Sequence, residues 1–289
     1  MTDTAHFPAL PASFQPCSLH PLYSEEDGTP YEHICLCDTA RGRCILKCAK
    51  GDELANYRRY LADNPPFAPR LLKTIPRGEE TFLLLENISG ENLQRCARPA
   101  LTVALDALIE LQRRYWNASD DGSFAATLPG RQKRRAYLAD TRLIAQYDCF
   151  LQLYNSIPRT LCHDDLLPFN VIANGDRAVL IDWEHAGILP YPVSLARLIA
   201  HGTEDPDALF YLTQADRDFA VGYYYDRLLA PLGIGYEVYR RDLDYFLFYE
   251  YCEWVFLGHK YDQTNGEYYR RYKLLADRHA AYLAERYGR

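Results

Sequence analysis

Long apolar runs, a leader-like start and an excess of basic residues are all missing from this chain of 289 residues. No apolar run approaches the ~18 residues that a membrane-spanning helix needs, so we expect no membrane segment. The N-terminal segment MTDTAHFPALPASFQP has neither the basic region nor the apolar core of a secretory signal, which favours a cytoplasmic location. The formal net charge of −7 argues against a nucleic-acid partner and permits a cationic small-molecule substrate.

Regularly paired cysteines are also absent, because the nine cysteines are odd in number and scattered along the chain. This usage is typical of reduced thiols and not of a disulfide framework. Four of them (Cys35, Cys37, Cys44 and Cys48) are close enough to suggest zinc, but the usual two-residue gap between ligands is missing. We therefore expect buried or half-buried thiols, with Cys35 and Cys37 on one face of a strand.

What the chain does contain is ordinary for a globular protein, with 48% apolar and 25% charged residues, and its length suits two lobes. One stretch stands out: residues 161–184, LCHDDLLPFNVIANGDRAVLIDWE. Two β-prone runs at 171–173 and 178–181 flank Asn174-Gly175-Asp176, which is a strong hairpin signal. The stretch is therefore predicted to form two antiparallel strands.

Four polar side chains of catalytic type accompany this predicted hairpin: His163, Asp165, Asn170 and Asp182. A hairpin brings the ends of its two strands together, so Asn170 before the first strand should lie beside Asp182 after the second. A carboxylate and an amide oxygen placed in this way can share Mg²⁺, which usually takes one or two protein carboxylates plus phosphate and water. Asp165 on the entering loop should face the same cavity, where it can accept a proton from a substrate hydroxyl.

The pattern His163-x-Asp165-x-x-x-x-Asn170, followed by Ile181-Asp182-Trp183-Glu184, resembles the catalytic loop and metal motif of the aminoglycoside phosphotransferase and choline kinase superfamily. Protein kinases have Arg between the His and the Asp, and Phe-Gly after the metal-binding Asp. This chain has Asp164 and Trp183-Glu184 instead, which points to the small-molecule branch. The resemblance implies that Asp165 is the catalytic base, that Asn170 and Asp182 hold magnesium, and that His163 supports the loop.

The resemblance also implies an α+β, two-lobed, protein-kinase-like fold. Residues 1–88 would form a small antiparallel N-lobe with one helix that binds nucleotide. Residues 89–289 would form a larger, mainly helical C-lobe with the catalytic loop and the acceptor site. Residues 1–14 are expected to be a loose arm. Strands are expected over 17–23, 31–38, 43–49, 70–76 and 81–86, with a turn at 24–30 that has no GxGxxG pattern.

Within the N-lobe, Lys47 interrupts a β-prone apolar run, and the family pattern gives it a contact with the α- and β-phosphates of ATP. Its expected partner is Glu53 on the helix predicted over 52–61. Lys50 is a rival for Lys47, and Asp52 is a rival for Glu53. Glu86 to Ile88 resemble the hinge whose backbone binds adenine.

The C-lobe is expected to have helices over 99–116 and 131–154, the second with a basic start (Arg131, Lys133, Arg134, Arg135) on a solvated face. At 193–198 a helix is expected with Ser194 where the family has Asp, and Ser is a competent N-cap. In the tyrosine-rich C-terminal part, Glu250 and Trp254 are candidate contacts for an acceptor, by charge and cation–π attraction, or else simple core. Glu184 is another candidate.

The function that these features predict is an ATP- and Mg²⁺-dependent kinase. It would transfer the γ-phosphate to a hydroxyl of a small molecule such as an aminoglycoside, a choline-like amino alcohol or a sugar. The alternative is a non-catalytic nucleotide-binding scaffold on the same fold, which the acid-rich first loop and the missing aspartate at Ser194 favour. A protein substrate is a third possibility. The sequence does not separate the acceptors, because an acceptor pocket is built from dispersed helices.

Overall fold

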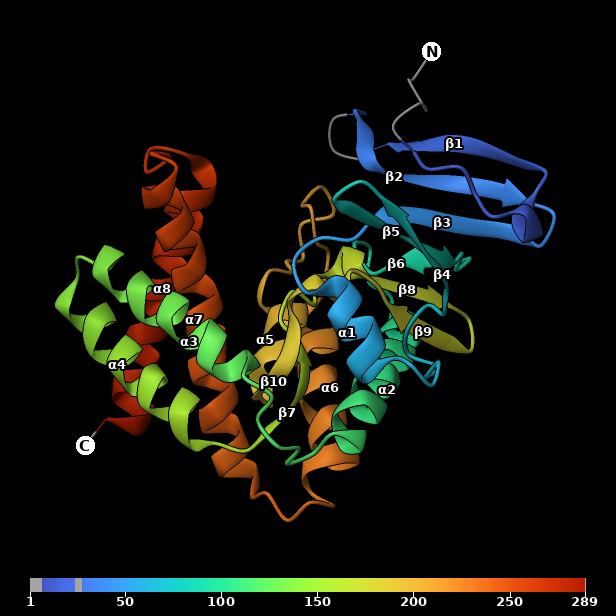
Figure 1. Ribbon diagram of the computed structural model, residues 1–289. Helices are drawn as coiled ribbons and strands as arrows, with labels where there is room; N and C mark the ends of the chain where they lie inside the picture. Colours follow the sequence, from blue (N-terminus) through green and yellow to red (C-terminus); the bar gives the residue numbers. More distant parts are fainter. Residues whose placement is uncertain (1–6, 24–27, 289) are drawn as a thin grey trace.

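The computed structural model describes residues 7–23 and 28–288. Residues 24–27 of the predicted first turn and residues 1–6 of the predicted arm lie outside this range. Two lobes are evident, a β-rich N-terminal lobe and a larger helical lobe, as the sequence predicts (Figure 1). No helix in the described ranges has the length and apolar character needed to cross a bilayer.

The N-lobe is built on a five-stranded antiparallel sheet in the order β1-β2-β3-β5-β4. Its elements are β1 Cys17–Tyr23, β2 Pro30–Thr39, β3 Gly42–Cys48, α1 Glu53–Tyr60, β4 Leu71–Arg77 and β5 Glu80–Glu86. The predicted strands and the predicted helix are therefore confirmed to within a few residues.

Alternation along β3 decides what faces the space between the lobes. Cys44, Leu46 and Cys48 are buried on one face of the sheet, because successive side chains of a strand point to opposite sides. Lys47 therefore points to the other face, where α1 and the C-lobe lie. The thiols of Cys35 and Cys37 share the first face, are buried, and are free, as predicted.

The segment predicted to be a loose arm is instead ordered from residue 7 onward. Leu10 and Phe14 are buried against the outer face of the sheet in one cluster with Leu46 and Phe82, and Phe7 meets Phe82 edge-on. Apolar side chains that cover an otherwise exposed sheet face gain roughly 1.5–3 kcal/mol each on burial. The prediction of a loose arm was wrong for residues 7–14, because no turn or periodic pattern in the sequence indicates a segment that covers a sheet in this way.

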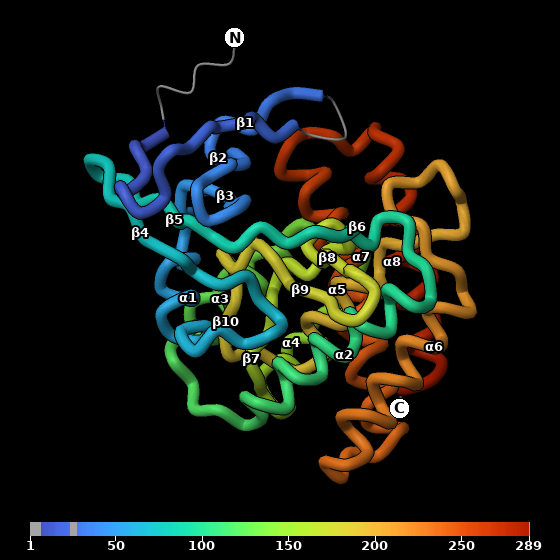
Figure 2. Tube along the Cα trace, turned by 90° about the vertical axis from the view of Figure 1, so that its right-hand side faces the viewer, coloured from blue at the N-terminus to red at the C-terminus, as the bar shows by residue number. Residues whose placement is uncertain are grey.

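The C-lobe surrounds a large apolar core that also takes in α1 and part of β5. Its elements are β6 Glu91–Asn92, α2 Arg98–Arg114, α3 Ser123–Arg134, α4 Thr141–Ser156, β7 Arg159–His163, β8 Val171–Asn174, β9 Arg177–Leu180, β10 Ala186–Pro190, α5 Pro192–Ala200, α6 Gln214–Tyr224, α7 Tyr236–Lys260 and α8 Glu267–Tyr287. Strands β6, β8 and β9 form one small sheet, and β7 pairs with β10. The view in Figure 2 shows the N-lobe sheet lying over the β8–β9 hairpin, with the long helices α7 and α8 behind it.

Two helix predictions need correction. The helix predicted over 131–154 is broken: α3 ends at Arg134, a short turn covers Arg135–Tyr137, and α4 begins after Asp140, whose side chain accepts a hydrogen bond from the Arg142 backbone (2.7 Å). Aspartate is a preferred N-cap, so it starts a new helix there. Ser194 is not an N-cap either. It lies inside α5, and its hydroxyl accepts a hydrogen bond from the backbone N–H of His163 (2.9 Å).

Candidate active site

The β8–β9 hairpin forms as the sequence predicts, with Val171 opposite Leu180 and Asn174 opposite Arg177. The Ile181 backbone N–H donates to the Asn170 carbonyl oxygen (2.9 Å). This hydrogen bond keeps the two strands together at the end of the hairpin opposite the turn. Asp182 then adopts a left-handed conformation with φ of 65°, which Asp tolerates better than most residues. Asn170 and Asp182 are neighbours at this end.

The loop that enters the hairpin is held by backbone and side-chain bonds. His163 is fully buried, and its Nε2 donates to the Ile181 carbonyl oxygen (2.8 Å), which ties β7 to the strand that leads to Asp182. The Asn170 side-chain amide donates to the Asp165 carbonyl oxygen (2.8 Å) and lies 3.4 Å from Asp165 Oδ2. The loop therefore brings Asp165, Asn170 and Asp182 to one place.

Lys47 reaches this place from the N-lobe. Its Nζ lies 2.9 Å from Glu53 Oε1 and 2.6 Å from Asp182 Oδ1. Burial lowers the pKa of Lys47, but the two carboxylates outweigh it, so the pKa is raised and the side chain stays charged. Geometry thus favours Lys47 over Lys50 and the buried Glu53 over Asp52, which is exposed.

Helix α1 is also bonded directly to the segment that follows the hairpin. The side-chain amide of Asn56, a buried residue that the sequence analysis did not single out, donates to the Trp183 carbonyl oxygen (2.8 Å). Trp183 is itself buried, with Nε1 donating to the Leu180 carbonyl oxygen (2.7 Å). The position of Glu53 and that of Asp182 are therefore linked through backbone and core, as well as through Lys47.

Asp165 has a partner that the sequence analysis missed. Arg197 on α5 donates to Asp165 Oδ1 (2.8 Å) and to Glu250 Oε2 (2.9 Å). Burial raises the pKa of Glu250, but Arg197 and His201 outweigh it and lower that pKa to about 2. The sequence did contain a signal for this contact. Arg197 is the one charged residue in the apolar helix PVSLARLIA, and a buried charge needs a partner.

The Glu250 carboxylate is therefore already paired within the protein. Its Oε2 also lies 3.2 Å from His201 Nε2, and His201 Nδ1 lies 2.9 Å from the Tyr272 hydroxyl. Because an ionised carboxylate only accepts, Nε2 of His201 must donate, and a neutral ring then accepts from Tyr272 at Nδ1. The order Asp165, Arg197, Glu250, His201, Tyr272 makes one continuous chain of polar contacts from the catalytic loop to α8.

Two buried histidines, His163 and His201, and the half-buried His279 make stability sensitive to mild acid. Burial lowers the pKa of His163, His201 and His279 below the ordinary value of 6.5. Each therefore binds a proton more readily in the unfolded chain, so stability is complete above pH ~6.5 and is lost as the pH falls through that value toward the folded pKa. The expected slope is about 1.4 kcal/mol per pH unit for each histidine.

Urea unfolding at pH 5 to 8 measures this slope. His279→Gln should make the dependence shallower, whereas His259→Gln, at an exposed residue of α7, should leave it unchanged. A free energy of unfolding that stays flat between pH 6.5 and 5 would contradict the account.

The remaining predicted site residues do not lie together. They are Glu184, Glu86, Ile88 and Trp254. Glu184 lies against Gly51, just after β3, so it sits on the N-lobe side of the motif; a Cβ at Gly51 would come within 3.1 Å of Glu184 Cγ. Glu86 ends β5, where its N–H donates to the Arg70 carbonyl oxygen (2.9 Å), and the half-buried Ile88 follows on the connection to β6. Trp254 stacks on Tyr272 with ring centroids 5.1 Å apart.

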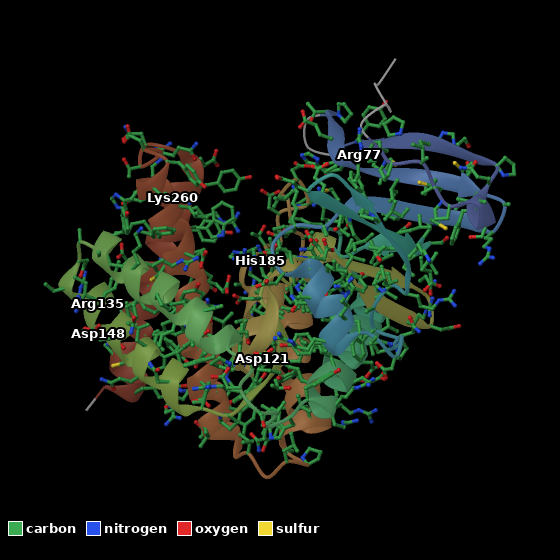
Figure 3. The ribbon with its side chains drawn as sticks, in the orientation of Figure 1. Arg77, Asp121, Arg135, Asp148, His185 and Lys260 are labelled. Atoms are coloured by element: carbon green, nitrogen blue, oxygen red, sulfur yellow. The ribbon has the colours of Figure 1, made fainter. Side chains whose placement is uncertain are left out.

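The basic start of the predicted second helix is a solvated face only in part, since Lys133 is exposed but Arg131 and Arg134 are not. Arg131 is buried, donates to Asp164 Oδ1 (2.5 Å) and lies over the rings of Tyr154 and Tyr249. Arg134 pairs with Glu253 (2.6 Å). Arg135, by contrast, does lie at the surface, where it meets Asp148 (2.7 Å), well away from His185 (Figure 3).

Two neighbouring arginines therefore offer a matched stability test. Arg131→Met leaves the carboxylate of Asp164 without its buried partner and should lower the free energy of unfolding by about 3–5 kcal/mol. Arg135→Met removes an exposed pair and should change it little. Urea unfolding at pH 7 compares the two; equal losses would show that Arg131 is not the structural residue its burial indicates.

The side chains at the hairpin end fit a magnesium ion. Asp182 is partly exposed, with a side-chain exposure of 40%, and only its Oδ1 is engaged by Lys47. The amide nitrogen of Asn170 is used toward Asp165, which leaves its Oδ1 as the free oxygen. A carboxylate and an amide oxygen are hard donors of the kind that Mg²⁺ prefers when phosphate and water supply the remaining ligands.

The comparisons with known proteins agree with this geometry. A model of the phosphotransferase enzyme family matches residues 43–230, and the chain belongs to that family. No curated protein sequence matches the chain. Among solved structures, a choline kinase from Cryptosporidium parvum is similar at a TM-score of 0.62 and 13% identity, over 96% of this chain and 92% of the other.

Two aminoglycoside phosphotransferases are also similar in fold. A 3′-phosphotransferase of type VIII gives a TM-score of 0.53 at 18% identity, over 81% of this chain and 95% of the other. An enzyme from Streptomyces rimosus, solved in complex with ADP and streptomycin, gives 0.51 at 17% identity, over 82% and 92%. At such identities the likeness shows a shared kinase-like fold. Together with the family match, it makes the chain a phosphotransferase by class.

Proposed function

We propose that the protein is an ATP- and Mg²⁺-dependent kinase that phosphorylates a hydroxyl group of a small molecule. The observation that carries this proposal is the meeting of Lys47, paired with Glu53, and Asp182 at the end of the hairpin where Asp165 and Asn170 also lie. Five groups from three separate segments of chain would not gather there by packing alone. Residues 1–88 would bind the nucleotide and residues 89–289 would supply the catalytic loop and the acceptor site.

Nucleotide binding would divide between two places in the N-lobe. The backbone of Glu86 to Ile88 would contact adenine; because the Glu86 N–H is already used by Arg70, its carbonyl and the Ile88 backbone are the groups we assign. Lys47 would contact the α- and β-phosphates, held in position by Glu53. Asn170 and Asp182 would hold Mg²⁺, which supplies neutralisation of phosphate charge when bound.

Phosphoryl transfer needs positioning and charge neutralisation more than covalent chemistry. Asp165 would accept the hydroxyl proton of the acceptor and point its oxygen toward the γ-phosphate. Arg197 holds Oδ1 of this carboxylate, so Oδ2 is the atom that would face the acceptor. His163 supports the loop from below, because its ring bonds to the Ile181 carbonyl and reaches no open space.

The acceptor site would lie between Asp165 and the parts of α7 and α8 around Trp254 and Tyr272. Trp254 stacks between Tyr272 and Tyr268 there, and the Glu250 carboxylate approaches from behind. However, Arg197 matches Glu250 and Arg134 matches Glu253, so this wall carries little unpaired negative charge. We therefore expect an acceptor with at most one positive charge, such as an amino alcohol or a sugar, in preference to a polycationic aminoglycoside.

ADP release from Mg·ATP, measured with a panel of acceptors, tests the proposal. The panel holds choline, ethanolamine, homoserine, common sugars and several aminoglycosides. Turnover with one of the first four classes that exceeds turnover with every aminoglycoside would support both the activity and the charge argument. Turnover with aminoglycosides alone would refute the charge argument. Mg·ATP binding without turnover on any acceptor would favour the non-catalytic scaffold.

A further inference from the structure

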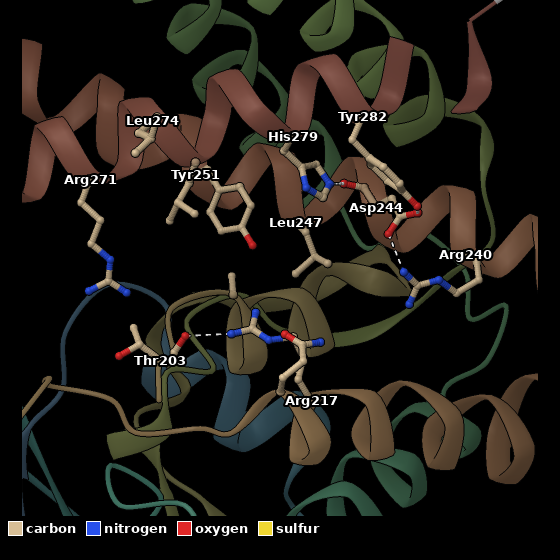
Figure 4. A pocket seen from close by; sticks show the side chains of 14 residues that line it. Thr203, Arg217, Arg240, Asp244, Leu247, Tyr251, Arg271, Leu274, His279 and Tyr282 are labelled. Atoms are coloured by element: carbon tan, nitrogen blue, oxygen red, sulfur yellow. Dashed lines mark hydrogen bonds and ion pairs between the residues drawn. The ribbon is translucent and has the colours of Figure 1, made fainter. Parts of the chain in front are cut away.

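A cavity of about 570 Å³ lies in the C-lobe between α6, α7 and α8 (Figure 4). Its volume is in the range of small-molecule sites. Among the described residues that line it, none is one to which a nucleotide, metal or acceptor role is assigned above. The cavity is therefore separate from the candidate active site and needs its own explanation.

The charges that face this cavity are mostly positive. Three arginines from three different helices line it: Arg217 on α6, Arg240 on α7 and Arg271 on α8. The carboxylate that faces them in the described lining is Asp244. This is unusual for a protein whose formal net charge is −7.

Asp244 is already matched within the protein. Its carboxylate accepts from Arg240 (2.8 Å) and from the hydroxyls of Tyr282 (3.0 Å) and Tyr287 (2.8 Å). His279 donates from Nε2 to the Asp244 carbonyl oxygen (2.8 Å), and burial lowers the pKa of this ring, so it is neutral at pH 7. The charges of Asp244 and Arg240 therefore balance each other. The positive charges of Arg217 and Arg271 are left.

Among the described residues, Arg217 and Arg271 are held by uncharged groups: Arg217 also meets the Tyr251 hydroxyl, and Arg271 lies over the Tyr272 ring. Arg217 donates to the Gly202 oxygen (2.7 Å), and Arg271 donates to the His201 oxygen (3.3 Å). Neither forms an ion pair with a carboxylate in residues 7–23 or 28–288, and the buried Nε of Arg217 has no hydrogen-bond partner there. Partly buried guanidinium groups in this state retain donors and charge for an anion, and their planar fork fits carboxylate and phosphate.

We propose that this cavity is a second binding site, for a small organic anion that carries a phosphate or carboxylate group. Figure 4 shows Arg271 reaching toward the cavity from α8 and Arg217 reaching toward it from α6, with the Tyr251 hydroxyl directed to the same space, so we expect one anion to meet both guanidinium groups. The hydroxyl of Tyr251 would add a neutral donor, and Leu247 and Leu274 would pack against the carbon skeleton of the ligand.

Calorimetry in a low-chloride buffer tests the site with inorganic phosphate, glycerol 3-phosphate and citrate as probes. At least one probe should bind the wild-type protein, and whether it carries phosphate or carboxylate identifies the headgroup. Arg217→Gln combined with Arg271→Gln should weaken that binding about tenfold or more, since each removes a charge-assisted hydrogen bond. Arg278→Gln, at an exposed residue of α8, is the matched control and should not change it.

A second variant guards against misfolding of the double substitution. Leu274→Glu, at a residue that is 49% exposed, places a carboxylate one helical turn from Arg271 and should also abolish binding. Mg·ATP affinity should be unchanged in all three variants, which would show that the fold and the proposed nucleotide site are intact. The proposal is overturned if no probe binds the wild-type protein, or if the double variant and Leu274→Glu bind as the wild type does.

Discussion

Asp165→Asn is expected to lower kcat by about 10²–10⁴-fold while the affinity for Mg·ATP stays nearly unchanged. The amide keeps the shape of the carboxylate and can still accept a hydrogen bond from Arg197, so the loop should hold its position. It cannot accept the proton of an acceptor hydroxyl. The loss should therefore fall on the chemical step and not on nucleotide binding, which we assign to Lys47, Asn170 and Asp182.

The matched control for this variant is Asp176→Asn, at the exposed tip of the same hairpin. Its kcat and Mg·ATP affinity should equal those of the wild type. Steady-state turnover and calorimetry with Mg·ATP measure both quantities. Unchanged turnover in Asp165→Asn would remove this residue from the role of base.

Asp182→Asn is expected to act on the metal instead. An asparagine tolerates the left-handed backbone at this position better than other residues, so the fold should survive. The variant loses the carboxylate that pairs with Lys47 and that we assign to Mg²⁺, and kcat/KM should fall by about 10²–10³-fold or more.

Nucleotide titrations with and without Mg²⁺ distinguish this effect from a general loss of binding. In the wild type, Mg²⁺ should strengthen ATP binding, and in Asp182→Asn most of that gain should disappear. ATP affinity without metal should be kept or slightly improved, because a negative charge near the phosphates is gone. Full Mg·ATP affinity in the variant would count against a metal role for Asp182.

Features encoded by neighbouring residues were predictable from the sequence. The Asn-Gly-Asp turn between two β-prone runs predicts the hairpin, and the hairpin alone places Asn170 beside Asp182. The family pattern indicates Lys47 and its partner Glu53, with Lys50 and Asp52 as rivals, and the alternation along β3 then turns Lys47 away from the buried face. In each case the partners are close in sequence, or a single turn fixes their geometry.

Features that depend on partners far apart in sequence were not predictable. Arg197 is 32 residues from Asp165 and 53 residues from Glu250 in the sequence. The residues around Arg197 in α5 do not indicate either partner. Arg131 is read as solvated from its basic neighbours, yet a carboxylate 33 residues away and two tyrosine rings bury it. The same limit applies to the acceptor pocket, because it draws its side chains from separate helices.

The measurement that tests the central claim most directly is transfer of label from [γ-³²P]ATP to an acceptor in the presence of Mg²⁺, with wild-type protein and Asp165→Asn side by side. The account predicts a labelled phosphate ester, formed with equal ADP, that requires Mg²⁺ and falls by about 10²-fold or more in the variant. Label transfer at the same rate in the variant, or binding of ATP with no transfer to any hydroxylated acceptor, would contradict it.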